Sequence, residues 1–213
     1  MVPPMSEVKI GKMMIGSVQT NFYFVYREGS KDIICIDPAD HGEQIYQKLT
    51  EEGFIIRAIL LTHGHFDHIF GCKSLKKLSE APIYAYMGEK SLLEDPALNV
   101  SDQVGRPYTV KVDHYLEDGA VIECADIKIK LIATPGHTAG SCCYYIEDAG
   151  LLISGDTLFE ESVGRSDLPT GNGALLGRSV TEKLFVLPEE TRVYPGHGDA
   201  TTIGHEKQYN PFF

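Results

Sequence analysis

The chain has 213 residues, 43% hydrophobic and 23% charged, a composition typical of a globular domain rather than a disordered segment. Its 30 acidic and 19 basic residues give a formal net charge of −11, which argues against nucleic acid as the main ligand because phosphate binding needs clustered lysine and arginine. No run approaches the roughly 20 apolar residues of a membrane-spanning helix, and the first residues lack the apolar core of a secretory signal. We therefore expect a single cytoplasmic domain over residues 1–213, with no nucleic-acid or membrane partner.

The first half of the chain predicts strands and helices in turn. Two apolar segments flank Glu28-Gly29-Ser30, which is the pattern of a β-hairpin. Asp40 is a candidate N-cap, and Ile45 and Leu49 follow at helical spacing. A short, continuous apolar run indicates a strand that is covered on both faces. We predict strands over 20–28, 32–37 and 59–61, and helices from Asp40 to about Gly53 and over 71–79.

The second half begins a new series of strands. Ile127, Ile129 and Leu131 alternate with lysines, as in a half-exposed strand, and the apolar segments CCYYI, LLIS and TRVY follow. A glycine-rich loop at 164–177 precedes a short helix expected near 178–186. Strands mixed with helices in both halves indicate an α/β or α+β layered fold.

The five cysteines are an odd number without C-x-x-C spacing, so they predict neither a disulfide framework nor a zinc ribbon. We expect buried thiols. Cys142 and Cys143 should point to opposite faces if their segment is a strand.

The segment from Thr62 to His68 carries the clearest chemical signal. It places His63, His65, Asp67 and His68 within six positions, directly after a buried apolar run. Burying polar groups without partners costs roughly a few kcal/mol each, and coordination of a metal by imidazole and carboxylate removes that cost. Because the whole chain has only eight histidines, a chance cluster on a polar loop is a poor alternative, and the segment predicts a metal site.

Three later residues share a local pattern with this segment. His137, Asp156 and His197 each follow an apolar run and a glycine that turns the chain. Residues at strand ends can converge on one edge of a sheet. The resulting set of ligand-type residues exceeds the four that a tetrahedral site takes, so two metal ions that share a carboxylate fit better.

The order and spacing of these residues resemble the metallo-β-lactamase superfamily, over nearly the whole chain from Asp37 to Asp199. The resemblance implies a four-layer αβ/βα sandwich, with two sheets packed face to face, helices outside and the metals at one sheet edge. It also implies that one metal is held by His63, His65 and His137, that the second is held by Asp67, His68 and His197, and that Asp156 bridges them.

Aspartate at position 156 is similar to the glyoxalase II branch rather than to the true β-lactamases, which commonly have cysteine there. The segments 164–171 (GRSDLPTG) and 202–207 resemble short, single-domain glyoxalase II-like hydrolases. The implied activity is hydrolysis of a small-molecule thioester such as S-lactoylglutathione by a metal-bound hydroxide, with Asp67 orienting the hydroxide or taking its proton. Two divalent ions are expected, zinc first, with iron or manganese also compatible.

Several alternatives stay open at this point. Persulfide dioxygenases resemble the chain as well, and their single Fe(II) would be held by His63, His137 and Asp156. A metal-binding module without catalysis is a third possibility, which the complete ligand set argues against. Arg165 could bind a substrate carboxylate or simply pair with Asp167. Asp37 could orient a ligand histidine, and neither a role for His205 nor the oligomeric state follows from the sequence.

Overall fold

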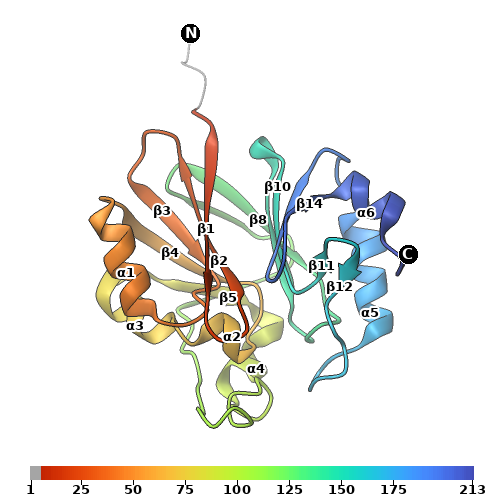
Figure 1. Ribbon diagram of the computed structural model, residues 1–213, viewed down its shortest axis with the longest axis horizontal. Helices are drawn as coiled ribbons and strands as arrows, with labels where there is room; N and C mark the ends of the chain where they lie inside the picture. Colours follow the sequence, from red (N-terminus) through yellow and green to blue (C-terminus); the bar gives the residue numbers. More distant parts are fainter. Residues whose placement is uncertain (1–5) are drawn as a thin grey trace.

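The computed structural model describes residues 6–213, and within them two six-stranded sheets pack face to face (Figure 1). The first sheet has the order β1-β2-β3-β4-β5-β6, and the second has the order β14-β13-β10-β9-β8-β7. The strands of the first sheet are β1 (Val8–Ile15), β2 (Thr20–Arg27), β3 (Asp32–Ile36), β4 (Ile55–Leu61), β5 (Ile83–Tyr86) and β6 (His114–Leu116). Those of the second are β7 (Val121–Cys124), β8 (Ile127–Ala133), β9 (Cys142–Ile146), β10 (Leu151–Gly155), β13 (Arg192–Pro195) and β14 (Thr201–Thr202).

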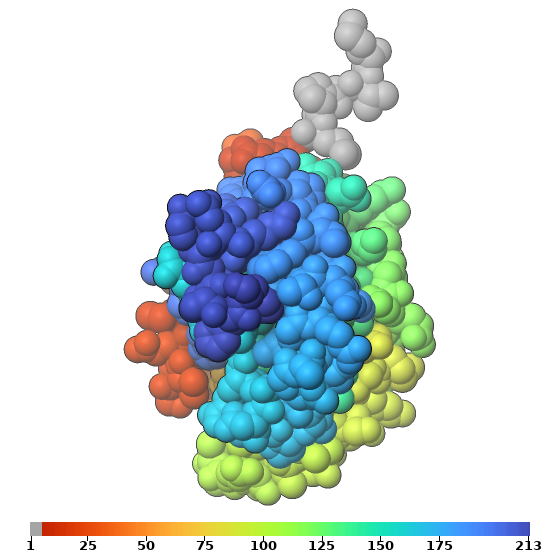
Figure 2. All heavy atoms as spheres, turned by 90° about the vertical axis from the view of Figure 1, so that its right-hand side faces the viewer, coloured from red at the N-terminus to blue at the C-terminus, as the bar shows by residue number. Residues whose placement is uncertain are grey.

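Helices cover the outer face of each sheet, and the remaining short elements lie in the connections (Figure 1). Figure 2 shows residues 173–213, in shades of blue, covering much of the face that lies on the right in Figure 1, the side of the second sheet. The helices are α1 (Gly42–Glu51), α2 (Phe66–Ile69), α3 (Cys72–Ser79), α4 (Lys90–Glu94), α5 (Gly173–Arg178) and α6 (Ile203–Tyr209). The short elements are η1 (Met87–Glu89), η2 (Glu147–Ala149), the π-helical turn η3 (Ser179–Leu184) and the hairpin of β11 (Leu158–Phe159) and β12 (Ser162–Val163).

Three apolar clusters hold these four layers together. The first lies between the two sheets and includes Leu60 and Cys142. The second fills the space between the first sheet and α1 and α3, and it includes Ile59 and Leu61. The third lies between the second sheet and η3 and α6, and it includes Cys143. The neighbours Ile59, Leu60 and Leu61 therefore contact both faces of the first sheet, and the two adjacent cysteines point to opposite faces, as the sequence predicted.

The strand directions bring several chain segments to one edge of the sandwich. β3 and β4 are parallel, so both end at the same edge of the first sheet. β8 and β10 are each antiparallel to β9 and therefore run in one direction, and β13 is parallel to β10. At the two facing edges, Thr62 O accepts from Cys142 N–H at 2.9 Å and Gly196 O accepts from Asn21 N–H at 2.7 Å. The loops after β4, β8, β10 and β13 consequently meet.

Two details of the predicted helices are wrong. Asp40 does not cap α1: the N-cap is His41, at a φ of 52°, and the Asp40 carboxylate accepts from His41 N–H at 2.7 Å instead. The helix expected near 178–186 begins earlier, at Gly173, because Asn172 caps it by accepting from Leu175 N–H at 3.0 Å. Of the helices in residues 6–213, none has the length and apolar character to cross a membrane.

Candidate metal centre

The structure brings all the ligand-type residues identified in the sequence to the edge where the strands end. They lie in four loops and one short helix, near α2 at the lower edge of both sheets in Figure 1. His63 and His65 follow β4, Asp67 and His68 belong to α2, His137 follows β8, Asp156 follows β10, and His197 follows β13.

One group of potential ligands consists of His63, His65 and His137. One ring nitrogen of each lies within 4.8 Å of those of the other two. His65 Nδ1 and His137 Nε2 are 2.9 Å apart, and all three side chains are buried. Three imidazole nitrogens that converge in this way form a suitable face for a zinc or iron ion.

The second group consists of Asp67, His68 and His197, whose ligand atoms also lie within 4.8 Å of one another. Asp67 Oδ2 lies 3.2 Å from His197 Nε2 and 3.5 Å from His68 Nε2. This group mixes carboxylate and imidazole, which are both ligands for zinc, iron and manganese.

Asp156 lies between the two groups. Its Oδ1 is 3.4 Å from His68 Nε2, and its Oδ2 is 3.5 Å from both His137 Nε2 and His197 Nε2. The carboxylate thus contacts imidazoles of both groups. Glycine at 196 is required for this approach, because a Cβ there would lie 2.1 Å from Asp156 Oδ1 and 2.7 Å from His68 Cε1.

In several of these histidines, the Nδ1 atom has a polar contact of its own. His68 Nδ1 donates to Asp37 Oδ2 at 2.9 Å, and the Thr62 hydroxyl donates to the same carboxylate oxygen at 2.6 Å. Thr62 Oγ1 in turn lies 3.1 Å from His63 Nδ1. His137 Nδ1 donates to the carbonyl oxygen of Arg165 at 2.7 Å. Such contacts fix the tautomer and orientation of metal-binding histidines, and Asp37 is placed as the orienting carboxylate considered from the sequence.

Unpartnered buried atoms show that the site fits metal ions. Within residues 6–213, the Nε2 atoms of His63, His65 and His68 and the Oδ1 atom of Asp156 are buried without a hydrogen-bond partner. Buried polar atoms almost always have partners, and an unmet one points to an ion or other missing group. Of these atoms, His68 Nε2 and Asp156 Oδ1 lie 3.4 Å apart, where the two groups meet. His65 faces His137 through its other ring nitrogen, Nδ1, which is therefore its candidate ligand atom.

The charges of these side chains shift one another's pKa values. Burial and the nearby His137 ring lower the pKa of His65 to about 3. Although burial opposes it, hydrogen bonds to Asp156 and Asp67 raise the pKa of His197 to about 9. Burial also opposes ionisation of Asp67, yet the His68 ring and the other contacts lower its pKa to about 2. Against the effect of burial, the His68 ring also holds the pKa of Asp156 well below its usual value. Both carboxylates are therefore ionised at neutral pH, and a cation that binds here must displace protons from His68 and His197, whose pKa values are raised.

Thr20, at the start of β2, is a site residue that the sequence analysis missed. Its hydroxyl is fully buried and donates to Asp67 Oδ2 at 2.8 Å. Nothing in the local sequence distinguishes it from an ordinary strand threonine.

Changing Thr20 to valine is expected to weaken the affinity of the second group for metal about tenfold. Losing a hydrogen-bond partner of a metal ligand usually lowers the metal affinity about 10–100-fold, and this estimate takes the lower end of that range. Valine keeps the shape and strand preference but removes the donor that orients Asp67. Competition with a chromophoric chelator measures the affinity. Thr20→Ser, which keeps the hydroxyl, serves as the control, and equal affinities in the two variants would contradict the orienting role.

A pocket of about 400 Å³ opens onto the two groups. Arg165 lines this pocket but is exposed, and its Nε and Nη2 donate to the two carboxylate oxygens of Asp167 at 2.7 and 2.8 Å. Of the two roles considered for Arg165, binding a substrate carboxylate or pairing with Asp167, the structure shows the pairing with Asp167. The apolar lining consists of Val18, Phe66, Val100, Phe159 and Leu168.

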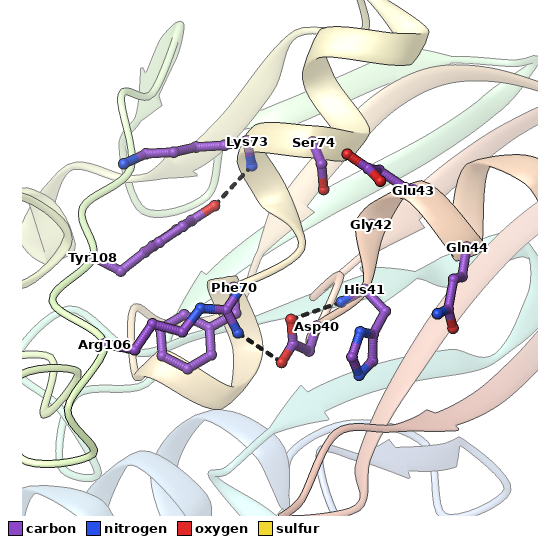
Figure 3. Close-up of a pocket in the computed structure, with 10 residues that line it drawn as sticks. All are labelled: Asp40, His41, Gly42, Glu43, Gln44, Phe70, Lys73, Ser74, Arg106 and Tyr108. Atoms are coloured by element: carbon purple, nitrogen blue, oxygen red, sulfur yellow. Dashed lines mark hydrogen bonds and ion pairs between the residues drawn. The ribbon is translucent and has the colours of Figure 1, made fainter.

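A second pocket, of about 340 Å³, lies beside the start of α1 and α3 (Figure 3). Arg106 pairs with Asp40 at 2.8 Å, and Lys73 N–H donates to the Tyr108 hydroxyl at 2.9 Å. Its lining includes none of the ligand-type residues described above. Ligand-type residues line the first pocket instead. His205 lies outside both pockets and pairs with Glu161 at 3.1 Å.

Comparisons with known proteins agree with this geometry. A family profile described as "Metallo-beta-lactamase superfamily" matches residues 15–197. A "Probable metallo-hydrolase" of Bacillus subtilis, YqgX, is 39% identical over 96% of this chain and 97% of its own length. A "Hydroxyacylglutathione hydrolase", GloC of Haemophilus influenzae, is 29% identical over 87% of this chain and 89% of its own length.

Solved structures are similar over most of the chain. BLEG-1, described as a B3 metallo-β-lactamase, has a TM-score of 0.91 with 40% identity and covers 96% of this chain and 99% of its own. TTHA1623, solved in a di-iron-bound form, has a TM-score of 0.85 with 34% identity, over 95% of this chain and 100% of its own. ETHE1 from Myxococcus xanthus has a TM-score of 0.76 with 26% identity, over 95% and 83%.

Proposed function

The chain belongs to the metallo-β-lactamase superfamily, and from that premise we propose that it is a metal-dependent hydrolase that cleaves a small-molecule thioester at a two-metal centre. The observation that carries the proposal is the position of Asp156, whose two carboxylate oxygens contact imidazoles of both ligand groups. A carboxylate placed in this way suits two cations held side by side. The similarity to a structure solved in a di-iron-bound form supports two ions rather than one.

The two groups divide the binding of the metals between them. When bound, two divalent cations would supply a water ligand with a pKa of about 7 and would polarise a substrate carbonyl. His63, His65 and His137 would hold one cation, and the second group, listed above, would hold the other, with Asp156 shared. Zinc, iron and manganese all accept these ligand types, and we propose zinc as the first to test.

Asp67 is the residue that we propose to orient the attacking water. Its low pKa keeps it ionised at neutral pH, so it can accept a hydrogen bond from the water or take its proton. Thr20 and His197 both contact Oδ2, so Oδ1 is the oxygen proposed for this role. Fixing one oxygen by these contacts limits the rotation of the carboxylate and so positions the other.

The pocket and the chemistry of the leaving group favour a thioester. Hydrolysis forms the bond between the water oxygen and the carbonyl carbon, breaks the carbon–sulfur bond and transfers the water proton to the leaving thiolate. A thiolate is weakly basic and needs less help from a general acid than an amine does. The apolar walls formed by Phe66, Phe159 and Leu168 suit an acyl or thiol chain, and the hydroxyacylglutathione hydrolase among the relatives supports a glutathione carrier.

The activity is tested by incubating the zinc-loaded protein with S-lactoylglutathione and following the release of free thiol. Saturable thiol release that disappears after chelation and returns with zinc is the expected result. The same preparation is assayed with a chromogenic β-lactam, because BLEG-1 is described as a β-lactamase, and for oxygen uptake with glutathione persulfide after loading with iron. Turnover of the β-lactam or the persulfide without thiol release from the thioester would overturn the proposal.

A further inference from the structure

Glu89 is a buried carboxylate close to the metal centre that none of the steps above uses. It lies at the junction of η1 and α4, in the connection that follows β5 of the first sheet. Only 2% of its surface is exposed. Within residues 6–213, Glu89 forms no ion pair with a lysine or arginine. Its carboxylate oxygens are partnered by hydrogen bonds instead. Burial raises its pKa to about 7, against hydrogen bonds that lower it.

The hydrogen bonds of Glu89 reach two loops that come from different sheets. Its Oε1 accepts from Gly64 N–H at 2.8 Å, and its Oε2 accepts from Gly140 N–H at 2.9 Å. The hydroxyl of Thr138 lies between them, at 2.9 Å from Oε1 and 3.0 Å from Oε2. Gly64 is the residue between His63 and His65 in the loop after β4. Thr138 is the neighbour of His137 in the loop after β8.

Close backbone packing accompanies these hydrogen bonds. A Cβ at Gly140 would lie 2.1 Å from Glu89 N and 2.2 Å from Gly88 C, so this loop rests directly on the peptide before Glu89. A Cβ at Gly64 would lie 2.7 Å from Leu92 Cδ2, so the other loop rests on α4. The two loops are therefore fitted to the same short segment, and Glu89 is the polar group at its centre.

We propose that Glu89 is a positioning residue for the metal centre: its carboxylate ties the loop of His63 and His65 to the loop of His137 and so sets the spacing of the three imidazoles. This inference rests on the proposed metal-dependent function. The carboxylate is suited to the task because it has two acceptor oxygens and meets a backbone N–H on each. Burying a carboxylate with no cationic partner is costly, so such a group is retained more readily for geometry than for stability.

The variant Glu89→Gln tests this role. Glutamine keeps the volume but replaces one acceptor oxygen with an NH₂ group, which must then face a backbone N–H of Gly64 or Gly140. We expect the affinity for zinc, measured by competition with a chromophoric chelator, to fall about 10–100-fold, the usual cost of losing a partner behind metal ligands. We also expect the visible spectrum of the cobalt-substituted protein to change, because the geometry of the imidazoles changes.

Glu206 of α6 provides a matched control. It is fully buried, and its carboxylate accepts from Thr201 Oγ1 at 2.6 Å, Glu161 N–H at 2.9 Å and Asn210 Nδ2 at 2.8 Å. Glu206→Gln thus removes a similar buried acceptor in the outer layer beside the second sheet. It should leave the zinc affinity and the cobalt spectrum unchanged, whatever its effect on thermal stability.

The outcomes separate this inference from the proposed function. If Glu89→Gln binds zinc as tightly as the unaltered protein, or if both glutamine variants lose affinity equally, the positioning role is overturned and the metal-dependent function stands. If the unaltered protein binds no zinc, iron or manganese, both are overturned.

A second pair of variants covers the case in which Glu89→Gln does not fold. Thr138→Val removes one donor to Glu89 and leaves both backbone N–H groups in place, whereas Thr138→Ser keeps the hydroxyl. We expect the serine variant to retain most of the zinc affinity and the valine variant to lose about tenfold. Equal affinities would overturn the role of Glu89.

Discussion

Replacing Asp156 with asparagine is expected to lower thioester turnover by at least about 10³-fold, beyond the typical cost of removing one hydrogen-bond donor from an active site. The same variant is expected to retain one metal ion or fewer per chain. Both carboxylate oxygens of Asp156 contact imidazole rings that could bind metal: Oδ1 contacts the ring of His68, and Oδ2 contacts the rings of His137 and His197. Asparagine is neutral and offers one oxygen, so it cannot serve both groups. Elemental analysis and the thiol-release assay measure the two effects.

Asp32→Asn is the control for this experiment. Asp32 begins β3, while the metal centre lies where β3 and its parallel neighbour end, and it pairs with the exposed Arg57 at 2.8 Å. Exposed ion pairs contribute at most about 1 kcal/mol, so this variant should keep its metal content and turnover. Retention of two ions and full turnover by Asp156→Asn would show that Asp156 is not shared between two metals.

Removal of the metal ions is expected to lower the melting temperature by about 8–16 °C. A ligand at a thousandfold excess over its dissociation constant stabilises the folded state by about 4 kcal/mol, and 1 kcal/mol corresponds to about 2–4 °C in a chain of this size. The structural reason is the set of unpartnered buried ligand atoms, Nε2 of His63 and His68 and Oδ1 of Asp156, which metal coordination would satisfy. Thermal unfolding before and after chelation measures the shift.

Back-addition of different ions shows whether that shift belongs to this site. Zinc should restore the higher melting temperature, whereas calcium should not, because calcium prefers oxygen ligands and most ligands here are imidazoles. An unchanged melting temperature after complete removal of metal would contradict the assignment of these side chains as ligands.

The position of the candidate site could be predicted from the sequence because its signal is local. The ligand-type residues lie in the loops after β4, β8, β10 and β13 or in the short helix α2 that follows β4, and the relative directions of the strands bring these loops together. A layered α/β or α+β fold followed from the alternation of strands and helices, whereas the face-to-face sheets with helices outside followed from the family resemblance. The parts that depend on a single residue's side chain or backbone angle were less predictable: the N-cap of α1 is His41, whose backbone is in the left-handed region, rather than Asp40.

The residues that support the ligands could not be predicted, because they act across long sequence distances. Thr20 contacts a carboxylate 47 positions away, and Glu89 contacts Thr138 at a separation of 49. Glu89 is one of 30 acidic residues, and its partners are mainly backbone N–H groups, which every residue except proline offers. Only the packing of the two loops on its own segment distinguishes it.

The measurement that tests the account most directly is the number of metal ions per chain in protein purified without chelator or added metal, determined by elemental analysis. We expect close to two divalent ions per chain, since the two groups and the shared Asp156 provide ligands for both. A content of one iron per chain that does not rise when zinc, iron or manganese is added would contradict the two-metal centre and would favour a mononuclear oxygenase.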